Sequence, residues 1–289
     1  MSLLSQAMVS GILAGGIYAM MSLGMSLSWG VLKVINLAQF SFILLSAYVT
    51  YELSTSLGWD PFLAIAVCVP LFAVAGMGLQ WVFDRFRISE FESLLFTFGL
   101  FIIFESLMAI VWTADFRRLS VEQNPYVSQA IGVGSLALPV PQLSAFIVAL
   151  AVAFGTRYLL NRTHFGRAVR AISQDREIAG AFGVDYGRVS MQLAGLAAGF
   201  AALGGVFIAM SQALFPGLGV EWFGIVFSVV ILGGLGSTLG TLIAAVIIGL
   251  VGAIATVMAG PSMAPLAIFL VLIVTLLFRP EGILGGRRV

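Results

Sequence analysis

Nine apolar runs, most of them as long as a lipid bilayer is thick, constrain this 289-residue chain more than any other feature. A helix needs roughly 20 apolar residues to cross a bilayer. The chain is also 60% hydrophobic and 9% charged, whereas soluble domains are about 25% charged. The sequence therefore predicts an all-α polytopic membrane protein with about eight to nine transmembrane helices, forming a single domain over residues 1–289. The predicted spans are 6–28, 35–54, 62–83, 93–113, 142–160, 189–211, 222–235, 238–258 and 264–278.

Two places in this pattern predict helices that are short or broken. The run 222–235 ends in the glycine-rich stretch 233–240, and only Trp29–Lys33 separates the first two runs. Lipid tolerates free backbone groups only where protein or a water-filled cavity surrounds them. We therefore expect both places to lie inside the protein.

Polar residues at these breaks are candidates for a substrate pathway, because polar groups inside spans are costly in lipid. Backbone groups that are freed at such breaks serve as ligands in other transporters. The alternative is purely structural, with polar contacts between helices and close glycine packing. The candidates at the first break are Asn36, Gln39 and Ser41, and those at the second are Gly233, Gly234, Gly236 and Ser237.

Glu105 is a further pathway candidate, since it is an isolated carboxyl group near the middle of a span. Such a group is protonated, hydrogen-bonded internally or exposed to a passage. We expect a role in the pathway or at an interface between subunits. Glu52 and Glu221 fall near the ends of spans, where solvation alone explains them.

Arginines orient the chain, because short cytoplasmic loops collect Lys and Arg. They gather in three segments: Arg85 and Arg87, six arginines within 157–188, and the C-terminal Arg279, Arg287 and Arg288. Even numbers of spans separate these segments, so all three fit the cytoplasm. The C-terminus is then cytoplasmic and the N-terminus external. Parity places the segment at about 114–141, with Arg117 and Arg118, outside as a connecting loop or as a receptor for an external partner.

The sequence shows no pattern typical of an enzyme, a metal site or a nucleic-acid-binding protein. The single histidine, His164, has no second metal ligand nearby, and no Ser/His/Asp set or paired acids occur in one motif. Cys68, the single cysteine, lies in an apolar run and predicts a small buried side chain. Lys33, the only lysine, is followed by Val34, so the chain has no phosphate-binding P-loop. The net charge of +1 argues against nucleic acid as a partner.

The charged loop at about 161–188 predicts a short amphipathic helix over Ser173–Gly183. In this prediction Ser173 caps the helix, the acids favour its positive end and Gly183 ends it in the left-handed conformation. Its apolar side holds Ile178, Ala179 and Phe182. Three interpretations stay open: an anchor on the membrane surface, a solvated loop, and a docking element for a cytoplasmic partner. Local chemistry alone favours the solvated loop.

Four segments of the chain resemble permease subunits of ABC importers of the high-affinity branched-chain amino-acid type. They are "GGIYAMMSLGMSLSWGVLKVINLAQFSFILLSAYV", "GRAVRAISQDREIAGAFGVDYGRV", "FSVVILGGLGSTLGTLIAAVIIGL" and "LLFRPEGILGG". The resemblance implies a multi-pass protein of the bacterial inner membrane that forms half of a transmembrane pathway with a second permease subunit, as a heterodimer. It also implies an external solute-binding protein and two cytoplasmic ATPases, which use ATP and Mg. This chain itself would bind no cofactor and catalyse no reaction.

The resemblance further implies that the predicted helix is a coupling helix, which the ATPases push during their nucleotide cycle. Ile178 and Phe182 would be its anchors, and the charged residues would fix its register. The full predicted set is Arg170, Ser173, Asp175, Arg176, Glu177, Ile178, Phe182 and Gly183.

The implied substrates are branched-chain or related apolar amino acids. The family commonly has Asn-Phe-Ala-His-Gly where this chain has Asn36-Leu37-Ala38-Gln39-Phe40, and glutamine does not titrate as histidine does. Urea, short amides and small aromatic or carboxylic acids are therefore alternative substrates. An ion-coupled secondary transporter is the alternative outside the family, for which only Glu105 lies deep enough in a span.

Overall fold

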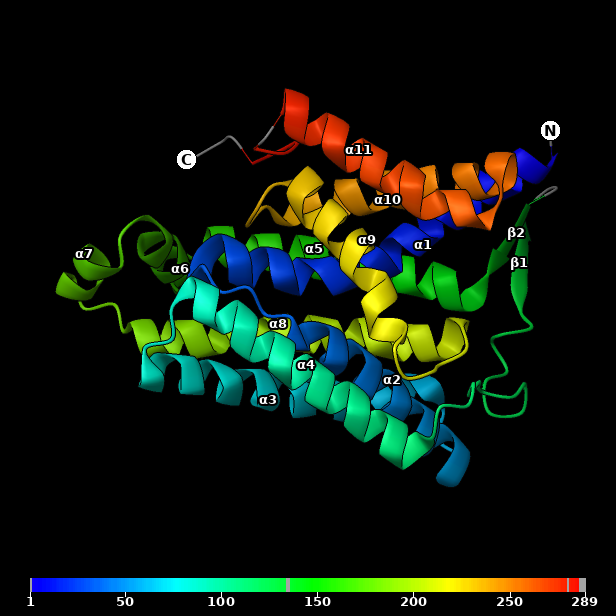
Figure 1. The fold of residues 1–289 in the computed structure, drawn as a ribbon, viewed down its shortest axis with the longest axis horizontal. Helices are drawn as coiled ribbons and strands as arrows, with labels where there is room; N and C mark the ends of the chain where they lie inside the picture. Colours follow the sequence, from blue (N-terminus) through cyan, green and yellow to red (C-terminus); the bar gives the residue numbers. More distant parts are fainter. Residues whose placement is uncertain (1, 134–135, 280, 286–289) are drawn as a thin grey trace.

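The structure is a computed structural model that describes residues 2–133, 136–279 and 281–285. Within these residues the chain forms a helical bundle with one small hairpin (Figure 1). The helices are α1 (Ser2–Leu27), α2 (Ala38–Ser56), α3 (Ala64–Phe86), α4 (Glu90–Trp112), α5 (Val140–Arg162), α6 (His164–Gln174), α7 (Arg176–Ala181), α8 (Tyr186–Ser211), α9 (Leu218–Gly233), α10 (Thr238–Ala259) and α11 (Ala264–Phe278). A π-helical turn, Ser28–Leu32, extends α1, and the strands are β1 (Ala130–Val133) and β2 (Leu136–Pro139).

The predicted class, an all-α polytopic membrane protein, is confirmed. In the described part of the chain, seven helices are long and apolar enough to cross a membrane. The shorter α9 and the more polar α2 join them as the remaining two of the nine predicted spans. The predicted break at 29–33 is also present, because α1 ends in the π-helical turn and Lys33 follows in the left-handed conformation with φ 57°.

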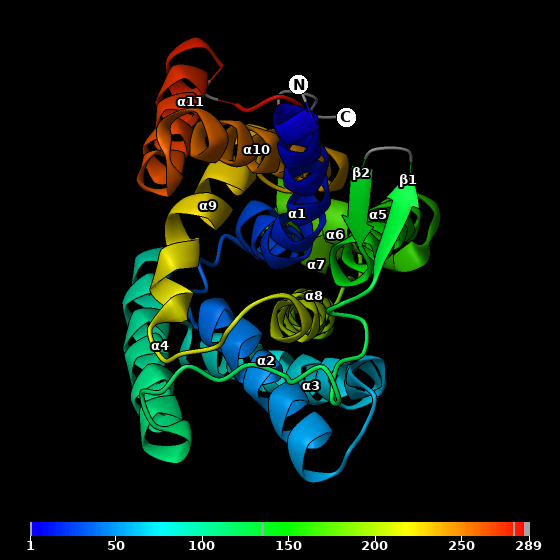
Figure 2. The same ribbon diagram turned by 90° about the vertical axis from the view of Figure 1, so that its right-hand side faces the viewer.

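The centre of the bundle is formed by α8 and α1, which lie between the other helices when the bundle is viewed from its end (Figure 2). Small residues let the backbones approach closely there. A Cβ added to Gly205 of α8 would lie 2.2 Å from the carbonyl oxygen of Ile43 in α2, and one on Gly24 of α1 would lie 2.4 Å from that of Ala197. Only glycine fits such contacts, which are the usual means of helix association in lipid.

A row of buried polar side chains along α2 faces this centre. Gln39 donates from Nε2 to the carbonyl oxygen of Met21 at 2.9 Å, and the Ser46 hydroxyl donates to that of Ala202 at 2.8 Å. The Thr50 hydroxyl bonds back to Ser46 O within α2. These bonds explain how a span this polar is accommodated inside the bundle. Cys68 is fully buried against this row, as predicted.

The segment predicted as a loop at about 114–141 contains an antiparallel hairpin, β1–β2, and α5 begins at Val140. Gln6 of α1 fixes the hairpin, since its Nε2 donates to Ala137 O at 2.7 Å while its Oε1 accepts from Ala137 N at 3.0 Å. Arg117 exchanges two backbone hydrogen bonds with Leu214, at 2.8 and 2.7 Å. The segment is therefore attached to α1 and to the α8–α9 connection.

Tyr126 ties the same segment to the start of α3. Its hydroxyl donates to Asp60 Oδ2 at 2.5 Å, and this hydrogen bond raises the pKa of Tyr126 above its ordinary value. Asn124 adds a bond from Nδ2 to Met210 O at 3.0 Å. Hydrogen bonds to α1, to the α8–α9 connection and to the start of α3 thus hold this segment over the ends of several helices.

The two ends of the bundle differ in charge. The α3–α4 connection, α6–α7 and the end of α11 lie toward one end of the molecule, which we name the arginine-rich end, while β1–β2 and the start of α1 lie toward the other, the hairpin end (Figure 1). This agrees with the prediction that the arginine clusters share one side of the membrane. Arg287 and Arg288 lie outside the described residues.

Candidate functional site

The two predicted helix breaks meet in space, although about 200 residues separate them in sequence. The backbone N–H of Gly236 lies within hydrogen-bond distance of the carbonyl oxygen of Ser26 at 3.0 Å and of its hydroxyl at 3.2 Å. A Cβ on Gly30 would lie 2.3 Å from Gly236 N. Any side chain at position 30 would force the breaks apart. The two breaks therefore form one joint between α1–α2 and α9–α10, which we call the break joint.

Glycines at the second break fit against the backbone of other segments. A Cβ on Gly233 would lie 2.6 Å from Thr241 N, and one on Gly234, whose φ is 90°, would lie 2.6 Å from Gly285. The C-terminal segment 281–285 packs here, because Ile283 N donates to Leu232 O at 2.7 Å. Ser237 caps α10 by accepting from Gly240 N at 3.1 Å. Most of these groups are thus used in packing and capping within the chain.

The candidates at the first break are held by α4 and α1. Thr97 Oγ1 of α4 accepts from Leu37 N at 3.0 Å, and the Ser41 hydroxyl lies 3.4 Å from Phe101 O. Gln39 is bonded to α1, as described above. Asn36 differs from its neighbours, since its Oδ1 is buried and has no hydrogen-bond partner among the described residues. Of the predicted pathway residues at this break, Asn36 therefore has the most capacity for an additional ligand.

Glu105 lies half-buried on α4, where it accepts a hydrogen bond from Gly217 N at 2.5 Å through Oε2. Gly217 directly precedes α9 and has a φ of 97°. The other carboxyl oxygen would lie 2.7 Å from a Cβ added to Gly219. One carboxyl oxygen is therefore hydrogen-bonded internally, whereas the buried Oε1 has no hydrogen-bond partner among the described residues. Glu105 thereby fixes the point at which the short helix α9 enters the bundle.

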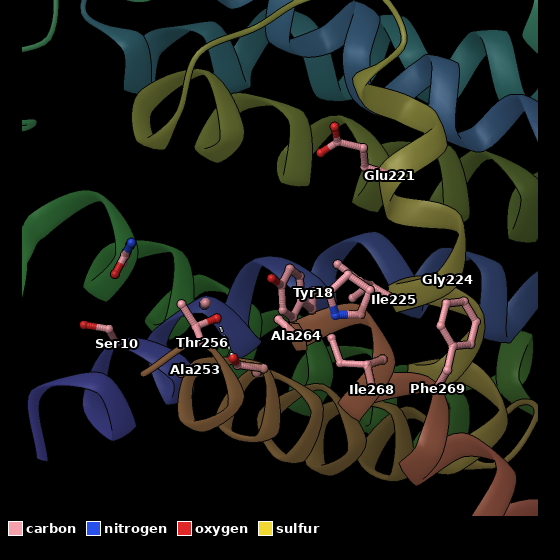
Figure 3. A pocket seen from close by; sticks show the side chains of 16 residues that line it. Ser10, Tyr18, Glu221, Gly224, Ile225, Ala253, Thr256, Ala264, Ile268 and Phe269 are labelled. Carbon is pink, nitrogen blue, oxygen red and sulfur yellow. Dashed lines mark hydrogen bonds between the residues drawn. The ribbon is translucent and has the colours of Figure 1, made fainter. Parts of the chain in front are cut away.

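A cavity of about 350 Å³, which we call the outer cavity, lies toward the hairpin end (Figure 3). It is lined by α1, α9, α10 and α11 with Gln142 of α5. Its wall is mainly apolar or glycine, with Tyr18, Ile225, Ile268 and Phe269 as its large apolar side chains. Glu221 of α9 is also a lining residue, but it is exposed and its carboxylate points away from Tyr18, Ile268 and Phe269 (Figure 3). The Oε1 of Gln142 is buried without a hydrogen-bond partner among the described residues. An apolar hollow with a few polar groups is the usual form of a small-molecule site.

The sequence interpretation missed this cavity. None of the predicted pathway residues lines it, and Glu221 had been explained by solvation. The available signal was the glycines of its wall, Gly11, Gly224, Gly249 and Gly252, but they belong to three different helices. Only the tertiary packing brings them to one wall.

The charged loop forms two helices, so the prediction of one helix over Ser173–Gly183 is wrong. Ser173 belongs to α6, where its hydroxyl donates to Arg170 O at 2.8 Å. Asp175 is the cap of α7, because its Oδ1 accepts from the N–H groups of Glu177 and Ile178, both at 2.9 Å. Gly183 follows α7 with a φ of 83°, which is the left-handed conformation predicted for it. The sequence thus predicted the C-terminal end of α7 correctly and its N-terminal start wrongly.

The side chains of α7 divide into an inner and an outer group. Ala179 is buried against Val169 and Ile172 of α6, so it does not share the outer side as predicted. Ile178 is 58% exposed and Phe182 is 84% exposed. Two large apolar side chains therefore face outward at the arginine-rich end, beside the exposed Glu177.

The arginines predicted to act in coupling each contact a neighbouring element of the same chain. Arg170 donates from Nη1 to the carbonyl oxygen of Leu160, at the end of α5. The guanidinium of Arg176 lies over the ring of Tyr186, with 3.4 Å from Cζ to the ring centroid. These contacts connect α6 to α5 and α7 to α8. Helices α6 and α7 are thus each attached to a span.

Comparisons with known proteins agree along the whole chain. The family profile described as branched-chain amino acid transport system / permease component matches residues 7–278. The chain is 24% identical to the high-affinity branched-chain amino acid transport system permease protein BraD of Pseudomonas aeruginosa, over 97% of this chain and 95% of that protein. The permease protein LivH of Escherichia coli is also 24% identical, with the same coverage.

An archaeal relative extends this similarity. It is the probable branched-chain amino acid transport permease protein LivH of Methanocaldococcus jannaschii, 24% identical over 95% of this chain and 90% of that protein. No solved structure gives a significant match. The match to residues 7–278 covers almost every described helix. The chain therefore belongs to the family of permease components of branched-chain amino acid transport systems.

Proposed function

We propose that this chain is the permease subunit of an ATP-driven ABC importer that passes branched-chain or related apolar amino acids into the cytoplasm. The observation that carries the proposal is the outward-facing pair Ile178 and Phe182 on α6–α7. Exposed large apolar side chains beside charged ones are typical of a docking element. The chain lacks a P-loop, so the energy would come from separate subunits.

The proposed complex contains a second permease subunit, two cytoplasmic ATPases that use ATP and Mg, and an external solute-binding protein. The arginine-rich end would face the cytoplasm of a bacterial cell and the hairpin end the outside. Closure of the ATPases would push α7, and Arg170 and Arg176 would pass the movement to α5 and α8. The segment at about 114–141, which lies at the hairpin end, would receive the external protein.

The proposed substrate agrees with the names of the relatives and with the chemistry of the outer cavity. Its apolar wall suits a branched side chain. At the first helix break, beside the break joint, the Oδ1 of Asn36 is buried and has no hydrogen-bond partner among the described residues. We propose a route from the outer cavity past Asn36, Gln39 and Ser41, with the break joint as its moving part. Gly233, Gly234, Gly236 and Ser237 would allow that movement, and Glu105 would position α9.

The test is reconstitution of the complex copurified from its native membrane into proteoliposomes. We expect uptake of labelled leucine that needs ATP, the ATPases and the external protein. Uptake by this chain alone, driven by an ion gradient, would instead identify a secondary transporter. Binding of leucine, urea and benzoate to the cognate external protein would separate the substrate classes, and preference for urea or benzoate would contradict an amino-acid substrate.

A further inference from the structure

A second cavity, of about 430 Å³, lies at the arginine-rich end. It opens between the first helix break, the α3–α4 connection and the start of α8. Its wall carries three cations, Lys33, Arg87 and Arg176, and two acids, Asp84 and Glu90. None of these residues lines the outer cavity, and the two cavities have no lining residue in common.

The five charges do not neutralise one another directly. Among the described residues, none of them forms an ion pair within 4.0 Å. Asp84 is bonded to neutral donors instead, the Ser190 hydroxyl at 2.7 Å and Gln80 Nε2 at 3.1 Å. Glu90 accepts from Trp29 Nε1 at 3.2 Å. Among the described residues, each acid is therefore bonded to neutral donors, and the three cations have no acidic partner within 4.0 Å.

The same cavity has an apolar part. Leu32 and Phe83 are buried side chains in its wall, and Ile88 is partly buried there. A hollow with unpaired charges of both signs and an apolar wall does not suit a simple anion, which would leave the acids uncompensated. It suits a zwitterion with an apolar side chain, because carboxylate and ammonium groups then each form charge-assisted hydrogen bonds.

We propose that this cavity binds a zwitterionic apolar amino acid, such as the imported substrate, from the cytoplasmic side. The carboxylate pairs with Arg87, Arg176 or Lys33, the ammonium group with Glu90 or Asp84, and the side chain rests on Leu32 and Phe83. This inference rests on the proposed function for the class of its ligand and for the side of the membrane.

Occupancy of this site has a consequence for transport, because the cavity wall joins elements that the proposed cycle moves. Lys33 directly follows the π-helical turn at the break joint, and Arg176 is the first residue of α7. An amino acid between them holds α7 against the first helix break. Accumulated substrate in the cytoplasm therefore stabilises one arrangement of α7 and slows further import.

The test measures binding separately from transport, on the complex copurified with its ATPases and held in nanodiscs without the external protein. We expect saturable binding of labelled L-leucine. L-leucinamide, which lacks the carboxylate, and 4-methylpentanoate, which lacks the ammonium group, should each compete at least about tenfold less well. Equal competition by either analogue would overturn recognition of a zwitterion.

Matched variants locate the binding. Arg87→Gln and Glu90→Gln should each weaken L-leucine binding about tenfold or more. Arg85→Gln is the control, since Arg85 is exposed two residues from Arg87 and does not line the cavity. Unchanged binding in both cavity variants, or equal loss in the control, would contradict the site. Saturating L-leucine should also lower ATP hydrolysis in the parent complex and not in Arg87→Gln.

Uptake measured on the same preparations separates this inference from the proposed function. If ATP-driven leucine uptake occurs but L-leucine does not bind to the complex, the cytoplasmic site is wrong and the proposed function stands. If the complex takes up no amino acid, the proposed substrate is wrong, and the site loses the reason for its ligand class.

Discussion

Helix α8 and helix α11, the latter together with the turn Pro261–Met263 before it, are both apolar and long enough to cross a membrane, but they occupy opposite positions in the bundle. In the most apolar stretch of α8, 83% of residues are buried, against 6% in α11. The difference lies in side-chain size: α8 is rich in glycine and alanine, whereas α11 is mostly leucine, isoleucine, valine and phenylalanine. Lipid removes the hydrophobic drive for helix association, so close packing of small residues decides which helix is central.

The comparison also clarifies the exposed apolar residues of α7. Large apolar side chains on α11 have lipid or a neighbouring subunit to face. Ile178 and Phe182 lie in a polar segment beyond the ends of the spans, where lipid tails do not explain them. The size of the apolar side chains and their position relative to the spans thus distinguish three kinds of apolar surface. These are the packed centre, the membrane face and the docking face.

The largest effect is expected from enlarging a small residue at the centre. Gly205→Val should prevent correct folding, because its Cβ alone would lie 2.2 Å from Ile43 O, and overpacking usually costs about 1–3 kcal/mol even where side chains can adjust. The measurement is the yield of monodisperse protein from the membrane. Gly155→Val is the control, as a Cβ there meets nothing within 4 Å. Equal yields of the two variants would show that α8 is not tightly packed.

The next effect concerns the docking face. Phe182→Asp should leave the protein in the membrane and reduce ATP-driven uptake about tenfold or more, since it places a charge in an apolar contact. ATP hydrolysis by the complex should continue without matching uptake. Phe182→Leu, which stays apolar, should retain most of the uptake. Undiminished uptake in Phe182→Asp would remove Phe182 from the coupling contact.

An intermediate effect is expected at Glu105, which joins exposed α4 to the start of α9. Glu105→Leu removes the acceptor for the partly buried Gly217 N and should destabilise the protein by at most about 1–3 kcal/mol, the cost of a fully buried unsatisfied donor. Glu105→Gln keeps a carbonyl acceptor and should preserve both stability and transport. The measurements are the thermal unfolding midpoint in nanodiscs and uptake across pH. Loss of transport in a stable Glu105→Gln variant would show that the charge acts in the pathway.

The sequence predicted the spans well because each span is a local property of about 20 residues. The nine predicted runs correspond to α1–α5 and α8–α11. Local chemistry was ambiguous at the start of α7, where Ser173 and Asp175 are both capable caps. Ser173 bonds back within α6, which leaves Asp175 to cap α7. The hairpin was missed because its strands have only four residues each.

The site was less predictable than the fold. The break at Trp29–Lys33 and the one at 233–240 were each visible, but nothing local indicates that Gly30 and Gly236 touch. Both cavities likewise combine residues from several helices. Arg176 was predicted to face a partner, whereas Tyr186, ten residues later, holds it against α8. Hydrophobic periodicity and capping residues therefore predict single helices, whereas the sites depend on which helices pack against one another.

The smallest effect is expected on the membrane face of α11. Leu277 is 76% exposed, so Leu277→Ala should change the free energy of unfolding in nanodiscs by less than about 0.5 kcal/mol. Ile268 lies on the same helix but is only 4% exposed, and Ile268→Ala should cost about 2–5 kcal/mol by leaving a cavity. If Leu277→Ala proves as costly as Ile268→Ala in the copurified complex but not in the isolated chain, protein rather than lipid covers this face. The contrast between α8 and α11 would then describe one subunit only, and α11 would belong to an interface with a neighbouring subunit.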